Sequence, residues 1–326
     1  MRPPPVSRLV NDLHSALNAT RVARIHTPRS IAGIRACILD AARQGLPVAT
    51  CGGRHAMGGQ QFALDAVLLD MRHMRRVLAF DQAAGLIEVE AGIQWPELID
   101  YLEAAPAPHG RRWSIRQKQT GADRLSLGGC LAANIHGRGL RMRPFIGDVE
   151  ALTLVDANGE LRHCSRTRDP ELFALAIGGY GLFGVIASIQ LRLAPRQAMR
   201  RDVSLLDLDQ LMPAFAERID AGYAFGDFQF AIDPASRDFL RRGVFSCYVP
   251  VERMPPAGAA RELSEQDWRA LLHLAHTDKT RAFDCYAAHY LATDGQHYWS
   301  DRLQQSTYLD GYHRELDRGL GIAAPR

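Results

Sequence analysis

The stretch that decides the fold is Thr50-Cys51-Gly52-Gly53-Arg54-His55-Ala56-Met57-Gly58-Gly59-Gln60. It follows a short apolar run, Leu46-Pro47-Val48-Ala49, which predicts a strand. Its four glycines allow backbone conformations closed to other residues and bring N–H groups close to a ligand. Converging N–H groups of this kind bind anions such as a pyrophosphate. The segment is also compatible with an ordinary turn that carries an exposed histidine, because isolated glycine-rich loops are common.

Two further segments rich in small residues follow along the chain. One is Gly121-Ala122-Asp123-Arg124-Leu125-Ser126-Leu127-Gly128-Gly129-Cys130-Leu131-Ala132-Ala133-Asn134-Ile135-His136-Gly137, and the other is Gly178-Gly179-Tyr180-Gly181-Leu182-Phe183-Gly184-Val185-Ile186. A flat, bulky cofactor needs small residues where the backbone must approach it closely. Together and in this order, the three segments resemble the FAD-binding domain of the vanillyl-alcohol oxidase and p-cresol methylhydroxylase (PCMH) family.

The resemblance covers roughly residues 20–195 and includes 68–74 and 87–92, which look like that family's paired strands. The second motif is similar to that of sugar and polyol oxidases related to decaprenylphosphoryl-ribose oxidase. The resemblance implies an α+β fold, with a two-subdomain FAD-binding PCMH-type domain at 20–195. An α+β cap or substrate domain with antiparallel strands would follow at 196–326. The chain stops sooner than the family's cap domain does, so we expect that domain to be truncated.

The resemblance also implies FAD as the cofactor and indicates which residues would contact it. The first segment would wrap the pyrophosphate, the second would line the diphosphate, the ribityl chain and the ring face, and the third would contact the adenine half. The predicted cofactor-binding residues are Thr50, Cys51, Gly52, Gly53, Arg54, His55, Ala56, Met57, Gly58, Gly59, Gln60, Gly121, Ser126, Leu127, Gly128, Gly129, Ala133, Asn134, Ile135, His136 and Ile186.

His55 raises the question of a covalent link to the flavin. In several family members, the histidine of a G-H-S-x-x-G-Q pattern is bonded to the flavin's methyl carbon. The present chain keeps this histidine, the second glycine and the glutamine, but has Arg54 and Ala56 in place of the first glycine and the serine. A neutral imidazole is a competent nucleophile. Covalent attachment through His55 and a simple hydrogen bond near the cofactor both remain open.

Two residues next to the expected flavin ring are the catalytic candidates. His136 lies in the Ile135-His136-Gly137 motif, where it can hydrogen-bond a substrate hydroxyl, stabilise developing charge or simply orient the loop. Arg138 lies where sugar-oxidising relatives carry a lysine, and it can recognise an anion or remain a solvated surface residue. The sequence does not single out a general base.

Composition narrows the remaining possibilities. The chain has 326 residues, is 47% hydrophobic and carries a net charge of +3, which suits about two folded domains. Its arginines are scattered, so nucleic-acid binding is not expected. None of the six cysteines forms a C-x-x-C pair, which argues against disulfides or a metal site and for a reducing, cytoplasmic setting. Apolar runs are too short for a membrane span.

The spacing of apolar residues and the positions of capping and turn residues predict the main helices and strands. Helices are expected at 30–44, with Ser30 as N-cap, and at 94–102, 169–176, 205–221 (broken or entered at Pro213), 264–276 and 298–315. A hairpin is expected at 149–164, turning at Asn158-Gly159, because this pair favours the turn that matches strand twist. Further strands are expected at 185–193, 227–232 and 244–249.

The reaction implied by the resemblance is the oxidation of a C–OH carbon in a sugar, polyol or similar polar alcohol, with hydride passing to flavin N5. Oxygen or another acceptor would then reoxidise the flavin. Two alternatives stay open. The pattern from His55 to Gln60 also resembles amine or cytokinin-type dehydrogenases, and an early chain end is compatible with a truncated flavin-binding protein without turnover.

Overall fold

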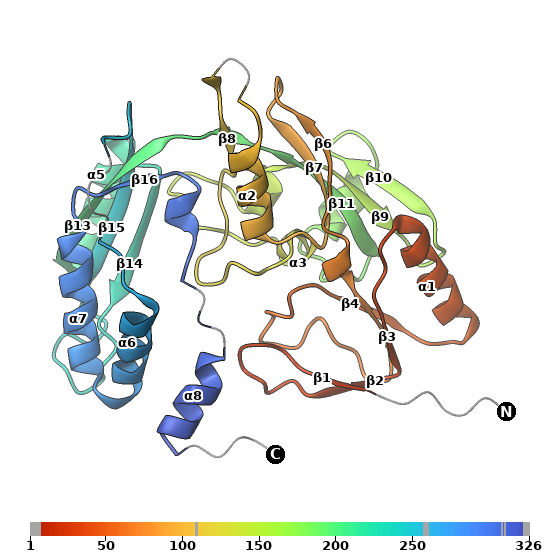
Figure 1. The fold of residues 1–326 in the computed structure, drawn as a ribbon, viewed down its shortest axis with the longest axis horizontal. Coiled ribbons are helices and arrows are strands. Elements are labelled where there is room, and N and C mark those ends of the chain that lie inside the picture. The colour runs from red at the N-terminus through yellow and green to blue at the C-terminus, as the bar shows by residue number, and fades with distance from the viewer. Residues whose placement is uncertain (1–7, 108–109, 257–260, 308, 310, 322–326) are drawn as a thin grey trace. The chain divides into compact units, whose positions relative to one another are not determined.

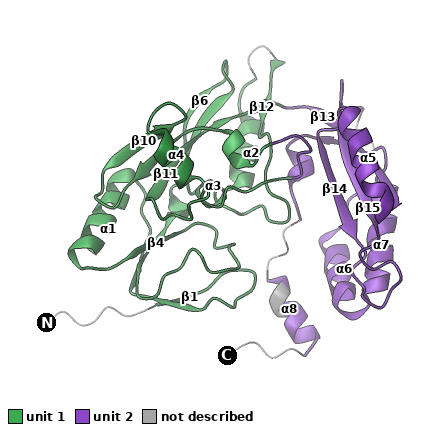
Figure 2. Ribbon diagram, turned by 180° about the vertical axis from the view of Figure 1, so that it is seen from behind, with its two compact units in different colours: residues 1–137, 143–195 green, residues 138–142, 196–326 purple. Residues whose placement is uncertain are grey.

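The computed structural model describes residues 8–107, 110–256, 261–307, 309 and 311–321 (Figure 1). The chain divides into two compact units (Figure 2). Unit 1 comprises residues 1–137 and 143–195, and unit 2 comprises 138–142 and 196–326. Unit 2 therefore takes in a short segment, 138–142, that the sequence assigned to the cofactor domain. Both units mix helices with sheets, as the α+β prediction requires.

Unit 1 is built on a five-stranded antiparallel sheet of order β10-β9-β11-β7-β6. Its largest hydrophobic cluster joins this sheet to two helices through buried residues such as Leu98 and Leu131. The strands are β6 (Val77–Asp81), β7 (Leu86–Glu90), β9 (Val149–Val155), β10 (Leu161–Ser165) and β11 (Val185–Arg192), and the helices are α2 (Trp95–Ala104) and α3 (Leu127–Ala132).

A second sheet of unit 1 is parallel and has the order β3-β5-β4. Its strands are β3 (Arg24–His26), β5 (Val67–Asp70) and β4 (Val48–Cys51). Helix α1 (Ile31–Arg43) buries Ile34, Ile38 and Ala41, spaced to share one face, against residues of both sheets. The strands predicted near 68–74 and 87–92 exist as β5 and β7. The expectation that they pair is wrong, because each belongs to a different sheet.

Shorter elements complete unit 1. They are the hairpin β1 (Arg8–Val10) with β2 (Thr20–Val22), the pair β8 (Trp113–Ser114) with β12 (Ala194–Pro195), helix α4 (Pro170–Ala176), and the 3-10 turns η1 (Met71–His73) and η3 (Phe145–Gly147).

The local signals of unit 1 are confirmed. Ser30 caps α1 by accepting a hydrogen bond from the Gly33 N–H. The hairpin at 149–164 pairs β9 with β10, and Gly159 in its turn has φ 74°, a conformation that suits glycine. Helix α2 begins at Trp95, with Pro96 in its first turn, where the missing N–H costs no helical hydrogen bond.

Unit 2 contains a four-stranded antiparallel sheet of order β14-β15-β13-β16. Its two buried clusters lie around Tyr248 and Phe245, which are three residues apart on β15 and so point to different faces. The elements are β13 (Ala198–Asp207), α5 (Leu208–Asp220), β14 (Phe225–Phe230), β15 (Arg242–Val251), α6 (Glu265–Thr277), α7 (Lys279–Ala292), β16 (His297–Trp299), η4 (Arg302–Gln304) and α8 (Tyr312–Gly319).

Several predictions for unit 2 need correction. The helix expected at 205–221 begins only at Leu208, because 205–207 extend β13 along β15. Pro213 lies inside α5 and neither breaks nor starts it. The helix expected at 298–315 is wrong, since β16, η4 and the start of α8 occupy that range. Helix α7 was missed, because its apolar residues do not gather on one face as they do in α1. Helix α6 and strands β14 and β15 are confirmed within a few residues.

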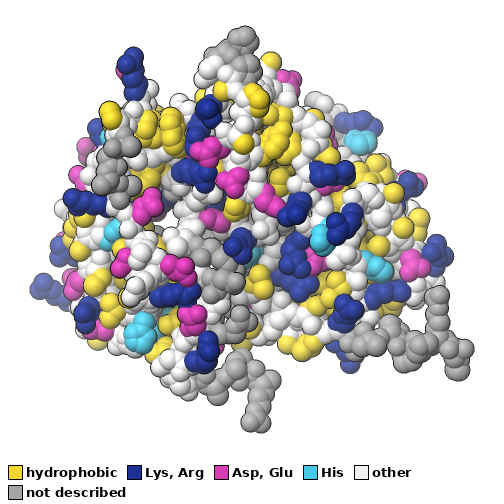
Figure 3. Space-filling view, in the orientation of Figure 1, with side chains coloured by type: hydrophobic (Ala, Val, Ile, Leu, Met, Phe, Trp, Pro, Cys, Tyr) yellow, Lys and Arg dark blue, Asp and Glu magenta, His cyan; other side chains and the backbone are white. Residues whose placement is uncertain are grey.

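Charged side chains are spread over the face drawn in Figure 3, where basic and acidic groups are intermixed. No helix in the described part of the chain is long and apolar enough to cross a membrane.

Candidate cofactor site

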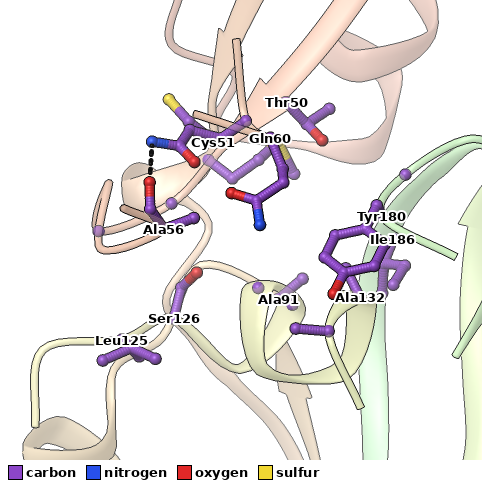
Figure 4. A pocket seen from close by; sticks show the side chains of 18 of the residues that line it. Thr50, Cys51, Ala56, Gln60, Ala91, Leu125, Ser126, Ala132, Tyr180 and Ile186 are labelled. Atoms are coloured by element: carbon purple, nitrogen blue, oxygen red, sulfur yellow. Dashed lines mark hydrogen bonds between the residues drawn. The ribbon is translucent and has the colours of Figure 1, made fainter. Parts of the chain in front are cut away.

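A cavity of about 310 Å³ in unit 1 is walled by all three small-residue segments. Thr50 at the end of β4, Ser126 before α3 and Tyr180 before β11 lie around the same space (Figure 4). The volume is at the low end for small-molecule sites, so the cavity holds only part of a dinucleotide. Segments more than 120 residues apart in sequence thus meet at one site.

Glycine is required where the first two segments touch. A Cβ added to Gly52 would overlap the Oγ and Cβ of Ser126. Gly128, at the start of α3, donates its N–H to the Ala91 carbonyl at 2.7 Å, and a Cβ there would stand 2.9 Å from the Ala91 side chain. These close approaches place backbone, rather than side chains, at the cavity wall.

The backbone N–H groups of Gly52, Gly53, Arg54 and His55 lie at this wall without a partner. No hydrogen bond joins any of them to another residue in the described ranges. These residues are buried or half-buried, so water satisfies such donors less readily than at an open surface. A run of unpaired donors in the lining of a cavity suits a bound anion, and it fits the pyrophosphate of a dinucleotide.

Each of the three segments contains one non-glycine residue with left-handed backbone. Arg54 has φ 60°, Asn134 φ 43° and Tyr180 φ 50°. Such conformations cost on the order of 1–3 kcal/mol and tend to cluster at ligand sites. Hydrogen bonds hold two of the three: Tyr180 donates its N–H to the Ala132 carbonyl at 2.9 Å, and the Asn134 Oδ1 accepts from the Ile146 N–H at 3.1 Å.

Arg54 is one of the two departures from the family pattern, and the structure shows how it is accommodated. It occupies the position of the pattern's first glycine and has a left-handed backbone, which glycine adopts without strain. Its guanidinium pairs with buried Asp70 at 3.3 Å, while Arg72 pairs with the same carboxylate at 2.6 Å. The two guanidiniums lower the pKa of Asp70 against the effect of burial, which raises it. Two cations on one carboxylate leave a net positive charge beside the cavity, which favours an anionic ligand.

His55 contacts a histidine that the sequence gave no reason to select. Its Nδ1 lies 2.6 Å from Nε2 of His14, which follows β1. Burial first, and then the charge of His14, lower the pKa of His55 from 6.5 to about 4, and a hydrogen bond with the Arg124 backbone works against this. His55 is therefore a neutral imidazole at neutral pH, as nucleophilic or hydrogen-bonding chemistry requires.

Two wall residues carry buried polar atoms that have no hydrogen-bond partner among the described residues: Arg54 Nε and Gln61 Oε1. Buried polar atoms in a folded protein nearly always have partners, and the exceptions call for a ligand or water. These atoms, the free amides and the excess positive charge together fit a polar, anionic cofactor.

The loop before Ser126 is held by a buried lysine. The Lys118 side chain is fully buried and forms an ion pair of 2.6 Å with Asp123. Its Nζ also donates to the Gln119 carbonyl at 2.9 Å, and the Gln119 Oε1 accepts from the Trp95 indole at 3.0 Å. This network fixes the approach to α3 and so the position of Ser126 at the cavity.

Most predicted cofactor-binding residues line the cavity. These are Thr50, Cys51, Gly52, Gly53, Arg54, His55, Ala56, Gln60, Ser126, Gly128, Gly129, Ala133, Ile135 and Ile186. Outside its lining lie Met57, Gly58, Gly59, Gly121, Leu127, Asn134 and His136, whose contacts with a cofactor remain predictions. The sequence did not select Gln61, Met71, Ala91, Leu125, Ala132, Tyr180, Gly181, Gly184 and Val185, although Tyr180, Gly181 and Gly184 belong to the third segment.

The two catalytic candidates lie in different units. His136, in unit 1, is exposed, and its Nδ1 is 3.2 Å from the Gly137 carbonyl. Arg138, in unit 2, is not a solvated surface residue, because its side chain is only 15% exposed and pairs with Asp227 at 2.6 Å. The pKa of Arg138 is raised; burial lowers it, but Tyr248 and Asp227 outweigh that effect. Among the described residues, no three His, Cys, Asp or Glu side chains are grouped to hold a metal ion.

Comparison with known proteins finds similarity to flavin-binding proteins over part of the chain. Residues 22–165 match the family described as "FAD binding domain". Cytokinin dehydrogenase 3 of Oryza sativa subsp. japonica is 32% identical over 184 residues, which is 54% of this chain and 33% of the relative. L-gulono-1,4-lactone dehydrogenase of Mycobacterium tuberculosis is 30% identical over 203 residues, 62% of this chain and 45% of the relative.

A further relative is of the kind that the second motif resembles. Decaprenylphosphoryl-beta-D-ribose oxidase of Mycolicibacterium smegmatis is 29% identical over 133 residues, 40% of this chain and 27% of the relative. The chain thus spans less than half the length of each of these three proteins. Residues 22–165 are thus similar to an FAD binding domain, and FAD is the cofactor that this similarity indicates.

Proposed function

We propose that this protein oxidises a C–OH carbon of a sugar, polyol or similar polar alcohol, with FAD as the acceptor. The observation that carries the proposal is the cavity of unit 1, where unpaired amides and a net positive charge meet within an FAD binding domain. Two relatives named for a lactone and a polyprenyl-phosphate sugar support a polar, oxygen-rich substrate. The cell compartment we propose is the cytoplasm.

In the proposed binding mode, the amides of Gly52 to His55 hold the pyrophosphate and Arg54 adds charge. Ser126 and the close-packed backbone at Gly128 hold the flavin half, while Tyr180 and Ile186 flank the adenine half. FAD, when bound, would supply a hydride acceptor at N5, and oxygen or another electron acceptor would reoxidise the reduced flavin. The chain's own task is to bind, orient and exclude water.

His136 and Arg138 remain the proposed catalytic residues. His136 would donate or accept a hydrogen bond at the substrate hydroxyl, because its ring is exposed and only one nitrogen is engaged, with the Gly137 carbonyl. Arg138 would orient an electronegative substrate group through its guanidinium. His55, as a neutral imidazole, would contact the flavin, either through a bond to its methyl carbon or through a hydrogen bond.

Anaerobic bleaching tests the reaction directly. Purified protein loaded with FAD is mixed without oxygen with polyols, aldoses and aldonolactones, and with a cytokinin and simple amines in parallel. We expect loss of flavin absorbance near 450 nm with a member of the first group. Bleaching by the cytokinin or an amine alone would replace the proposal with its nearest alternative.

The cytokinin-type alternative has support of its own in the similarity to cytokinin dehydrogenase 3. A second alternative is a flavin-binding protein without turnover, and it predicts bound FAD that none of these compounds bleaches. Acid precipitation of the loaded protein decides the link to His55. Colour that stays in the pellet and disappears in a His55→Gln variant means a covalent bond, and colour in the supernatant means none.

A further inference from the structure

The connection between β1 and β2, residues 11–18, lies against the glycine loop, residues 52–60, within unit 1. We call this connection the N-terminal turn. Its backbone provides one hydrogen bond to the loop, in which the Leu13 N–H donates to the Arg54 carbonyl at 3.0 Å. Arg54 has φ 60°, so this bond holds the remaining left-handed residue of the cavity segments.

Two side chains of the N-terminal turn also reach the glycine loop. The Nε2 of His14 lies 2.6 Å from the Nδ1 of His55. The Nδ2 of Asn18 donates to the Met57 carbonyl at 2.7 Å. A Cβ added to Gly59 would stand only 2.8 Å from the Asn18 Oδ1, so the two segments pack closely there as well. The N-terminal turn therefore contacts the loop along most of its length.

The N-terminal turn is folded around a buried carboxylate. Asp12 is 4% exposed and accepts hydrogen bonds from the backbone N–H groups of His14 and Ser15, at 3.0 and 2.6 Å. It also accepts from the Ser15 hydroxyl and the Asn18 side chain, each at 2.8 Å. Burial raises the pKa of Asp12, but these hydrogen bonds outweigh it and lower the pKa to about 2. The turn is therefore held in one conformation by its own residues and provides a fixed support for the loop.

The bond from Leu13 decides which way one amide of the glycine loop is directed. In a planar trans peptide, the C=O of one residue and the N–H of the next point in opposite directions. No peptide bond in the described ranges is cis. Because the Arg54 carbonyl is directed at Leu13, the N–H of His55 is directed away from it. That N–H has no partner among the described residues, and His55 lines the cavity, so the contact leaves this donor available to a ligand.

We propose that the N-terminal turn is a positioning segment for the cofactor, in which Leu13, His14 and Asn18 hold the glycine loop in the conformation that binds a pyrophosphate. Glycine-rich backbone has large conformational freedom. A loop that is already ordered binds its ligand more tightly, because less freedom is lost on binding. The inference goes beyond the proposed function, since it concerns how FAD is held and not which compound is oxidised.

The contact between His14 and His55 adds a polar bond to this packing. Their ring centres are 4.7 Å apart and their planes are tilted by 47°, so the rings meet at their nitrogen-bearing edges rather than by stacking. Between two neutral imidazoles, one nitrogen donates and the other accepts. The orientation of His55 in the cavity wall therefore depends on a hydrogen-bonding group at position 14, and a ring of similar shape without nitrogens would not replace it.

The first test measures FAD affinity by fluorescence titration of the full-length, cofactor-free protein. Asn18→Leu keeps the approximate size of the side chain and adds no charge, but it removes the donor to the Met57 carbonyl. We expect FAD affinity to fall at least tenfold. Leu17→Ala is the matched control, because Leu17 belongs to the same turn and is 74% exposed, and it should change the affinity less than twofold. Wild-type affinity in folded Asn18→Leu, or an equal loss in Leu17→Ala, would overturn the inference.

Two variants of His14 form an independent pair, which carries the test if Asn18→Leu fails to fold. His14→Phe keeps a ring and removes both nitrogens, and it should weaken FAD binding five- to tenfold. His14→Gln keeps a side-chain donor and acceptor, and its affinity should stay within twofold of the wild type. Wild-type affinity in His14→Phe, or the same loss in both variants, would contradict a positioning role for the hydrogen bond to His55.

Amide hydrogen exchange of the cofactor-free protein separates positioning of the loop from general stability. The Gly59 N–H donates to the Ala56 carbonyl at 3.2 Å within the loop, and it should exchange faster in His14→Phe and Asn18→Leu than in the wild type. The amides of β9 should be unchanged. Equal acceleration in β9 would mean that the variants only loosen unit 1 as a whole, and would refute the inference. None of these measurements involves a substrate, so a failure of the proposed oxidation is told apart from a failure of this inference.

Discussion

The two units surround positive charge in opposite ways. The cavity of unit 1 presents backbone N–H groups and small side chains. Its positive character comes from unpaired amides and from two guanidiniums that share one carboxylate. In unit 2, large side chains surround the buried guanidinium of Arg201, which lies against the rings of Tyr248, Tyr290 and Tyr298. The first arrangement leaves a signature of glycines in the sequence. The second leaves none, because its members come from separate elements and are ordinary residues one by one.

The largest effect on this contrast is expected from a side chain added where the backbone of unit 1 packs closely at the cavity. Gly52→Ala places a Cβ against the Ser126 side chain. We expect FAD affinity to fall at least 100-fold, about 3 kcal/mol, as measured by fluorescence titration. The double variant with Ser126→Gly should recover part of this loss. Unchanged affinity in Gly52→Ala would mean that close packing between these segments does not shape the site.

A second prediction separates charge from backbone strain at Arg54. Arg54→Gly should weaken FAD binding about tenfold, about 1.4 kcal/mol, because it removes a cation at the cavity wall. The melting temperature of the cofactor-free protein should stay equal or rise, because glycine adopts φ 60° without strain. The matched control is Arg72→Ala, which removes the other guanidinium on Asp70 but not a wall residue. Equal loss in both variants would show that Arg54 acts only through Asp70.

A third prediction concerns the pH dependence of stability. The folded-state pKa of His55 is about 4, below its ordinary 6.5. Between these values His55 is protonated in the unfolded chain but neutral in the folded chain. The free energy of unfolding therefore falls as pH drops from 6.5 to 4. Urea titrations of cofactor-free protein at pH 7 and 4.5 should show a smaller difference for His55→Gln than for the wild type. If the difference between pH 7 and 4.5 is the same in His55→Gln and the wild type, groups other than His55 cause the loss of stability in acid.

The smallest expected effect compares one thiol from each unit. Cys51 lines the cavity and is 3% exposed, and burial raises its pKa to about 11, whereas Cys285 on α7 is exposed. Iodoacetamide at pH 8 should label Cys285 first and leave Cys51 largely unmodified, as read by peptide mass spectrometry. Rapid labelling of Cys51 would indicate a cavity far more open than the structure shows.

Sequence alone was sufficient for features set by local chemistry. The Ser30 cap, the Asn158-Gly159 turn and the three small-residue segments each depend on a few adjacent residues, and the structure brings all three segments to one cavity. Contacts made by distant residues were out of reach. His14 lies 41 positions before His55, and nothing in either segment signals their contact.

Unit 2 was harder for the same physical reason. Its helix α7 lacks a clear apolar face, and residues 205–207 were assigned to a helix because their apolar side chains also suit one. Pairing with β15 decides the matter, and pairing is a long-range contact. The burial of Arg138 likewise depends on Asp227 and Tyr248, which lie about 90 and 110 positions further along the chain.

The most direct test of the central claim is amide hydrogen exchange, measured with and without FAD. If the main chain of the glycine loop binds the pyrophosphate, the amides of Gly52, Gly53, Arg54 and His55 should exchange freely in the empty protein and become protected when FAD is added. Protection confined to other parts of the chain, with these four amides unchanged at saturating FAD, would contradict the account.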